Sequence, residues 1–232
     1  MFHTWGFKDY IAKNSPIIHT LDIISDKLCA PYVPRPLRPN IGIDLKIYNP
    51  GSVSILRQTQ FLNSYNIAPH QKLITVISPL GVCLDNLISA AAKMQRDDFI
   101  IALFGSAHRK YAQKLIKMVK ESHAFGKIIF IGPESDLPSL LRASFAVLSL
   151  DRHSERLLKS AVAMARPTIW QNNGFGIAPN ITLNDTGEHA ITSAISTALD
   201  MPNAERDVIE KKNLAAAKAF SIEKTVDEFL NA

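Results

Sequence analysis

The sequence predicts an α/β fold built on a parallel, doubly wound sheet, and two observations carry this prediction. The first is a set of five short, continuous apolar runs, which are typical of strands buried on both faces. They are LITVIS (73–78), FIIALFG (99–105), KIIFIG (127–132), FAVLSL (145–150) and PTIW (167–170). The second observation is that helical patterns separate these runs, over 84–94, 108–123, 137–143 and 156–165. Alternating strands and helices imply right-handed crossovers between parallel strands.

The remaining elements lie before and after this alternation. An extended piece from Asn40 ends in a turn at Asn49-Pro50-Gly51, and a helix is expected over Ile55–Tyr65. Three closing helices are predicted over 188–200, 204–219 and 221–230, and Ser221 is the expected N-cap of the last one. Met164 and Trp170, both apolar and both within predicted elements, are expected in the core.

Composition narrows the classes of protein that are compatible with the sequence. The 232 residues suffice for one large domain with a good core. No apolar run reaches the roughly 18 residues that a membrane span needs, and the N-terminus has no signal-peptide h-region, so we expect a cytoplasmic protein, at most in peripheral contact with the inner face of a membrane. The histidines show no ligand spacing and predict no metal site. Cys29 and Cys83 are far apart, which favours free thiols over a disulfide.

The net charge of +5 does not by itself indicate a nucleic-acid partner, because lysines and arginines are dispersed. The densest cluster lies on the helix predicted over 108–123, whose apolar face is expected to contain Tyr111, Leu115, Ile116 and Val119. A solvated basic face is the favoured interpretation. An anionic membrane or nucleic-acid surface is the alternative.

The loop Asp151–Glu155 is the predicted location of function. It follows the fourth predicted strand and precedes a helix. In open parallel sheets, ligands bind at the carboxyl ends of strands, where helix N-termini offer free N–H groups.

Four motifs in register resemble the C-terminal, nucleotide-sugar-binding domain of GT-B glycosyltransferases of the retaining group 1, or family 4, type. GIDLKIYNP (42–50) is similar to G-V-D-x-x-x-F-x-P, and IGPESDLPSLLRASFAVLSL (131–150) to G-x-x-x-D-(L/M)-P-x-x-(L/Y)-x-x-A-D-x-x-(L/V)-x-P-S. SAVAMARPTIW (160–170) is similar to E-A-x-A-x-G-x-P-V-I-A, and AFSIEKTVDEFLNA (219–232) to the closing helix. The resemblance implies a Rossmann-like domain over 37–232 with extra C-terminal helices, preceded by a remnant of the acceptor domain over 1–36.

The resemblance also implies a function. The activity would be transfer of a hexose from a nucleoside diphosphate sugar, as co-substrate, to a lipopolysaccharide- or glycan-type acceptor, with no bound metal or other cofactor. Because the chain resembles only one of two GT-B domains, it is expected to be a truncated member, and a second chain supplying the acceptor domain is the partner that this implies.

Two departures from the family pattern bear on activity. The family's two glutamates, eight residues apart, fall on Arg152 and Ser160, and the stretch SPLGVCLDN (78–86) has Gly81 but no cation for the diphosphate. Charge-assisted bonds to phosphate are strong, so their loss weakens the donor site. The alternative to a glycosyltransferase is therefore a non-catalytic module that binds a partner. The candidate donor-binding residues are Gly81, Gly105, Glu134, Arg152, His153, Ser154, Glu155 and Ser160.

Overall fold

The computed structural model describes residues 42–78, 84–105, 109–133, 135–151, 154–171 and 177–230. The chain divides into two compact units. The larger unit spans Ile43–Ala219 and contains the sheet. Of the other unit, which is made of the two ends of the chain, residues 42 and 220–230 are described. The division of the chain at residue 36 stays a prediction.

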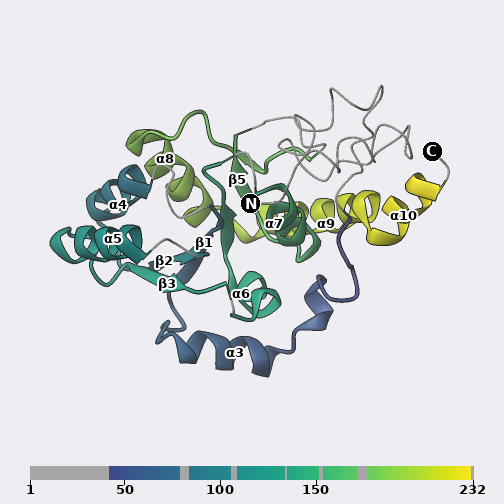
Figure 1. Ribbon diagram of the computed structural model, residues 1–232, viewed down its shortest axis with the longest axis horizontal. Helices are drawn as coiled ribbons and strands as arrows, with labels where there is room; N and C mark the ends of the chain where they lie inside the picture. Colours follow the sequence, from purple (N-terminus) through teal and green to yellow (C-terminus); the bar gives the residue numbers. More distant parts are fainter. Residues whose placement is uncertain are drawn as a thin grey trace, which may run out of the picture. The chain divides into compact units, whose positions relative to one another are not determined.

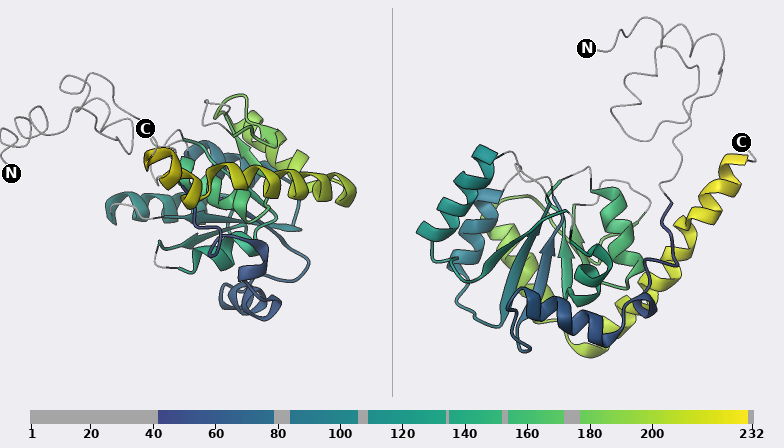
Figure 2. Two further views of the ribbon diagram at one scale, coloured as in Figure 1. Left: turned by 90° about the vertical axis from the view of Figure 1, so that its right-hand side faces the viewer. Right: turned by 60° about the horizontal axis from the view of Figure 1, so that its bottom comes forward.

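The sheet has six parallel strands in the order β3-β2-β1-β4-β5-β6. The strands are β1 (Lys72–Val76), β2 (Phe99–Phe104), β3 (Ile128–Ile131), β4 (Ala146–Leu148), β5 (Thr168–Trp170) and β6 (Ile181–Thr182). Figure 1 shows the sheet with its connecting helices, and Figure 2 shows it from two further sides. The predicted parallel, doubly wound α/β fold is confirmed, with the strand order of a Rossmann-like sheet.

Helices cover both faces of this sheet. The helices of the larger unit are α3 (Ile55–Ser64), α4 (Leu84–Lys93), α5 (Arg109–Glu121), α6 (Leu137–Ala143), α7 (Glu155–Ala163), α8 (Glu188–Leu199) and α9 (Asn203–Ala217). The short 3₁₀ turns are η1 (Pro50–Ser52) and η2 (Lys218–Phe220). Each helix expected between residues 55 and 230 is present, with its ends within two residues of the prediction; a short helix expected over 23–30 lies outside the described residues.

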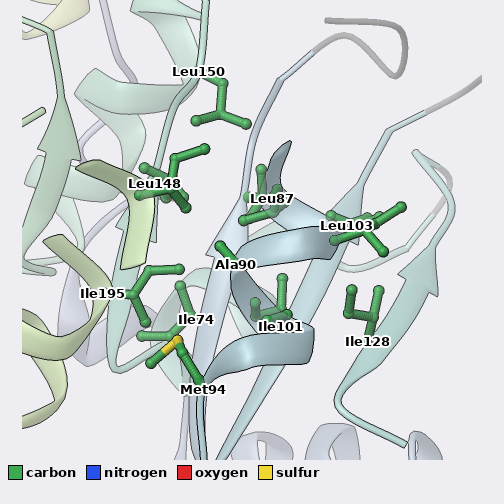
Figure 3. Packing of buried hydrophobic residues seen from close by; sticks show 14 of the residues in the cluster. Ile74, Leu87, Ala90, Met94, Ile101, Leu103, Ile128, Leu148, Leu150 and Ile195 are labelled. Carbon is green, nitrogen blue, oxygen red and sulfur yellow. The ribbon is translucent and has the colours of Figure 1, made fainter. Parts of the chain in front are cut away.

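Two apolar layers form because side chains alternate across the pleated strands. On one face, Ile74, Ile101 and Leu148 pack against residues of α4, α5 and α8 (Figure 3). On the other face, Leu73 and Val147 join residues of α3, α6 and α7. Trp170 and Met164 are buried, as expected. The core thus lies on both sides of the sheet, which explains why the strand sequences are apolar throughout.

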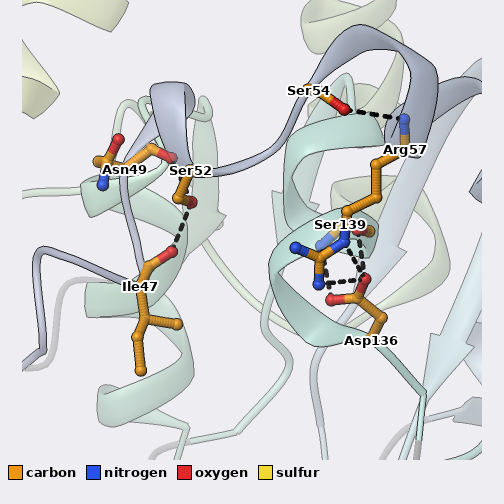
Figure 4. Close-up of polar contacts among 7 residues, drawn as sticks. All are labelled: Ile47, Asn49, Ser52, Ser54, Arg57, Asp136 and Ser139. Carbon is orange, nitrogen blue, oxygen red and sulfur yellow. Dashed lines mark hydrogen bonds and ion pairs between the residues drawn. The ribbon is translucent and has the colours of Figure 1, made fainter.

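Polar side chains fix α3 and α6 at their N-termini, as Figure 4 shows. Ser54 caps α3 by accepting a hydrogen bond from the amide of Arg57 at 3.2 Å, and Asp136 caps α6 in the same way through Ser139. The Nε of Arg57 donates to Asp136 at 2.8 Å. Partial burial alone would raise the pKa of Asp136, but the hydrogen bonds from Ser139 and the nearby Arg57 guanidinium outweigh burial and lower this pKa.

Helix α7 ends in a Schellman motif. The amide of Ala165 donates to Val162 O, and that of Arg166 to Ala161 O, both at 2.9 Å. Ala165 adopts a left-handed conformation, with φ of 60°, at the position where the family motif has glycine. This turn directs Arg166 toward α9.

The Arg166 guanidinium is buried between α7 and α9. Its Nη2 lies 3.2 Å from the Glu210 carboxylate, and its Nε donates to Met164 O at 3.0 Å. Asn213 of α9 donates to Arg166 O at 2.8 Å. Burial lowers the pKa of Arg166 to about 10, although the Glu210 charge opposes this, so the side chain keeps its charge at neutral pH. Hydrogen bonds and an ion pair thus dock α9 on the end of α7.

In the other unit, helix α10 (Ile222–Leu230) begins at the predicted N-cap. The Ser221 hydroxyl accepts a hydrogen bond from the Lys224 amide at 3.2 Å. Gly42 lies against the first turn of α10: a Cβ at this position would stand 2.7 Å from the Ile222 Cα and 2.8 Å from the Thr225 hydroxyl oxygen. Any side chain at residue 42 therefore requires a shift of the backbone.

Three expectations needed correction. The piece from Asn40 is not extended up to Asn49, because residues 44–48 form a turn. The Asp44 carboxylate accepts a hydrogen bond from the Lys46 amide at 2.8 Å, and the Asp44 backbone oxygen accepts one from the Tyr48 amide at 2.9 Å. Strand β6 was missed because two paired residues leave no apolar run. On α5, Leu115 and Val119 are buried but Ile116 is exposed, so the apolar face is narrower than predicted.

Candidate functional site

The candidate site lies where the strand order reverses. Successive strands move outward from β1 to β2 and β3, and then the chain returns to place β4 on the other side of β1. β1 and β4 are hydrogen-bonded neighbours, with Val76 paired to Leu148. In doubly wound sheets this reversal opens a crevice at the carboxyl ends of the two strands. The predicted loop Asp151–Glu155 follows β4 at this reversal.

Two buried serines join the ends of β1 and β4. The Ser78 hydroxyl, after β1, accepts a hydrogen bond from the Leu150 amide at 2.8 Å. The Ser154 hydroxyl, before α7, lies 2.6 Å from Ile77 O and 2.7 Å from the Asp151 carboxylate. Since a hydroxyl has one proton, it shares that proton between these two acceptors. Leu150 and Ser154 are thereby fixed to the end of β1.

This use of Ser154 leaves the start of α7 without a side-chain cap. Ser154 occupies the N-cap position, yet its hydroxyl makes no capping hydrogen bond. The residue is 4% exposed, and its side chain is turned toward β1. The N-cap side chain therefore offers no acceptor to the amides of the first turn of α7.

A buried ion pair lies in the first turns of α7. The ammonium of Lys159 is 2.5 Å from the Glu155 carboxylate, four residues earlier. The Lys159 side chain is 0% exposed, whereas that of Glu155 is 26% exposed. The ammonium is therefore withdrawn from solvent, whereas the carboxylate that it contacts stays partly exposed.

The other described candidates have defined positions. The Ser160 hydroxyl donates to Arg156 O at 3.0 Å, one turn back in the same helix, and the residue is 1% exposed. Gly105 directly follows β2 with φ of 143°, and its amide donates to Ile131 O at 3.1 Å. Gly81, Glu134, Arg152 and His153 lie outside the described residues. The donor-binding role of all these residues stays a prediction.

Sequence reasoning missed Ser78 and Lys159. Ser78 contacts Leu150 across 72 positions of sequence, and no local pattern reports such a contact. The ion pair of Lys159 could have been predicted from its spacing to Glu155, because Glu and Lys at positions i and i+4 form ion pairs on helices. The complete burial of Lys159, however, is a property of the tertiary structure that this spacing does not report.

Two other kinds of site find no support in the described part of the chain. Within it, no three His, Cys, Asp or Glu side chains are grouped so that they could hold a metal ion. None of its helices is both long and apolar enough to cross a membrane. The basic residues of α5 are partly paired, with Lys114 Nζ 3.5 Å from Asp85 and Lys117 Nζ 3.7 Å from Glu121.

Comparison with known proteins gives matches in structure alone. No family model matches the sequence, and no curated protein matches it either. The chain is similar to a glycosyltransferase from Rickettsia africae, with a TM-score of 0.78 and 16% identity over 97% of this chain and 65% of that one.

Two further glycosyltransferase-type structures are similar. Anabaena HepE in complex with UDP and glucose gives a TM-score of 0.77 at 15% identity, over 93% of this chain and 71% of that one. WaaG, a glycosyltransferase involved in lipopolysaccharide biosynthesis, gives 0.64 at 13% identity, over 89% and 61%. The chain thus spans about two thirds of the length of these proteins. Its Rossmann-like parallel sheet with helices on both sides is the fold that it shares with GT-B glycosyltransferases.

Proposed function

We propose that this chain is a donor-binding glycosyltransferase domain that takes a nucleoside diphosphate sugar at the carboxyl ends of β1 and β4. The observation that carries this proposal is the reversal of strand order between these strands, with the loop that precedes α7 fixed beside it by Ser154. A similar structure, HepE, contains UDP and glucose. UDP-glucose is therefore the first donor to test.

The proposed reaction is hexose transfer with retention to a lipopolysaccharide- or glycan-type acceptor, without a bound metal. A second chain is the proposed source of the acceptor domain. Positive charge near the diphosphate would stabilise the leaving group. Among the described residues, Lys159 supplies a positive charge in the first turns of α7.

A non-catalytic module that binds a partner is the second candidate, and Ser160 favours it. At the position where the resemblance implies a glutamate, the chain has a buried serine whose hydroxyl is bonded within its own helix. A ligand hydroxyl would meet no carboxylate from this residue.

Thermal unfolding of the full chain with UDP, GDP and their sugars at millimolar concentration tests the proposal. A ligand at about 100 times its dissociation constant stabilises the fold by about 2.7 kcal/mol. For a chain of this size, that raises the unfolding midpoint by roughly 5–10 °C. Uridine and glucose, which lack the diphosphate, are the controls and should give no shift.

The outcomes separate the two candidates. A shift with one nucleotide sugar, together with release of free nucleotide on incubation, supports the transferase. A shift without release of nucleotide supports nucleotide-sugar binding alone, because without an acceptor only water could take the sugar. No shift with any nucleotide, in a protein that unfolds cooperatively, contradicts nucleotide-sugar binding.

A further inference from the structure

The buried ammonium of Lys159 is the feature from which we start. A lysine side chain is almost never fully buried unless it is paired, because removing its charge from water is costly. Here the side chain is 0% exposed, and its Nζ lies 2.5 Å from the Glu155 carboxylate. The ammonium therefore needs an anion beside it at all times, but its chemistry does not require that anion to be a carboxylate.

The Glu155–Lys159 pair lies at the crevice, so the anion that Lys159 needs must also lie there. Glu155 is the first residue of α7, directly after Ser154, whose hydroxyl is 2.6 Å from the end of β1. Since the Lys159 ammonium contacts the Glu155 carboxylate, it also lies at this end of the helix. Glu155 is partly exposed and can turn outward by side-chain rotation, whereas Lys159 cannot.

We infer that Lys159 is the phosphate-binding cation of this site and that Glu155 is its resident counter-ion, which the phosphate of a ligand displaces. The inference rests on the proposed function only in assigning that phosphate to a nucleotide sugar. Exchange of one anion for another keeps the buried ammonium neutralised throughout. Glu155 then limits affinity, because every phosphate must compete with a carboxylate attached to the same helix.

A second pair in the chain provides a matched control. Glu188 is the first residue of α8, and its carboxylate lies 2.6 Å from the ammonium of Lys93. This pair has the same chemistry as Glu155–Lys159, and its glutamate has the same position at the start of a helix, but its lysine is the last residue of another helix, α4. The Lys93 side chain, however, is 70% exposed, so water satisfies it when the carboxylate leaves. Replacing Glu188 should therefore not make Lys93 bind phosphate.

The test measures the binding of inorganic pyrophosphate by calorimetry to the full chain and its variants. Glu155→Gln should bind pyrophosphate at least ten-fold more tightly than the wild type, because the competing carboxylate is gone. The double variant Glu155→Gln/Lys159→Met should lose this gain, and Glu188→Gln should bind as the wild type does. An unchanged affinity in Glu155→Gln, or a gain that survives in the double variant, overturns the inference.

Because Glu155→Gln leaves the buried Lys159 ammonium less well paired, this variant can fail to fold. In that case Lys159→Met is compared with the wild type, since methionine keeps the apolar stem and Glu155 can turn to solvent. At least ten-fold weaker pyrophosphate binding by Lys159→Met is expected, and equal binding overturns the inference.

The inference and the proposed function fail separately. Pyrophosphate has neither base nor sugar, so a gain in Glu155→Gln without UDP-glucose binding by the wild type contradicts only the proposed function. UDP-glucose binding by the wild type without any effect of Glu155 or Lys159 contradicts only the inference.

Discussion

Replacing Ser154 by alanine tests whether its hydroxyl fixes the site loop to β1. The Ser154 hydroxyl is buried and lies 2.6 Å from Ile77 O and 2.7 Å from the Asp151 carboxylate. A hydrogen bond contributes about 0.5–1.5 kcal/mol, and a buried acceptor left without its donor costs about 1–3 kcal/mol. We expect Ser154→Ala to lower the free energy of unfolding by about 2 kcal/mol.

Ser160 provides the control for this prediction because it is equally buried and lies in the same helix. Its hydroxyl bonds Arg156 O, which in a regular helix already accepts the amide four residues later. Removing this hydroxyl leaves no acceptor without a partner, and alanine has the higher helix propensity. We expect Ser160→Ala to change the free energy of unfolding by less than about 0.5 kcal/mol.

Urea unfolding followed by tryptophan fluorescence measures both variants, since the buried Trp170 reports on the core. The predicted result is a lower midpoint for Ser154→Ala with an unchanged m-value, and little change for Ser160→Ala. Equal losses in the two variants, or no loss in Ser154→Ala, would refute the reasoning that β1 and the loop are joined through this hydroxyl.

Two further predictions concern the polar contacts of the scaffold. The lowered pKa of Asp136 means that its carboxylate stabilises the fold above its unfolded pKa, and that this contribution is lost as the pH falls through the folded pKa. Asp136→Asn should therefore unfold at lower urea than the wild type at pH 7, with the difference closing towards pH 2; a constant difference would contradict this. Glu210→Gln leaves the buried Arg166 without its charged partner and should cost about 2–3 kcal/mol, below the usual cost of about 3–5 because Glu210 is partly exposed. The control Glu188→Gln, whose partner Lys93 is exposed, should cost about 0.5 kcal/mol or less in the same urea titration, and equal losses would contradict the difference.

The sequence predicted the fold well because the signals of a doubly wound sheet are local. Strands buried on both faces appear as continuous apolar runs, and the helices between them have their own periodicity. Strand β6 has only two paired residues and left no such signal. The turn at Asp44 depends on hydrogen bonds from two amides, one to the Asp44 side chain and one to its backbone oxygen, which an apolar pattern does not report.

The place of the site was predictable, but its internal contacts were not. The rule that ligands bind at the carboxyl ends of parallel strands pointed to Asp151–Glu155, and the strand reversal lies beside that loop. The bonds of Ser78 and Ser154 to the opposite strand join residues more than 70 positions apart. The burial of Lys159 arises from tertiary packing, since a lysine in a helix is usually exposed.

Hydrogen exchange of the full chain with and without saturating UDP-glucose tests the central claim most directly. If the ligand binds at the strand reversal, amides in peptides covering 72–84 and 146–160 should exchange more slowly in its presence. Peptides of α5, on the edge of the sheet beside β3, should be unaffected. No protection in any peptide, or protection confined to segments away from the carboxyl ends of β1 and β4, would contradict the claim that this crevice is the donor site.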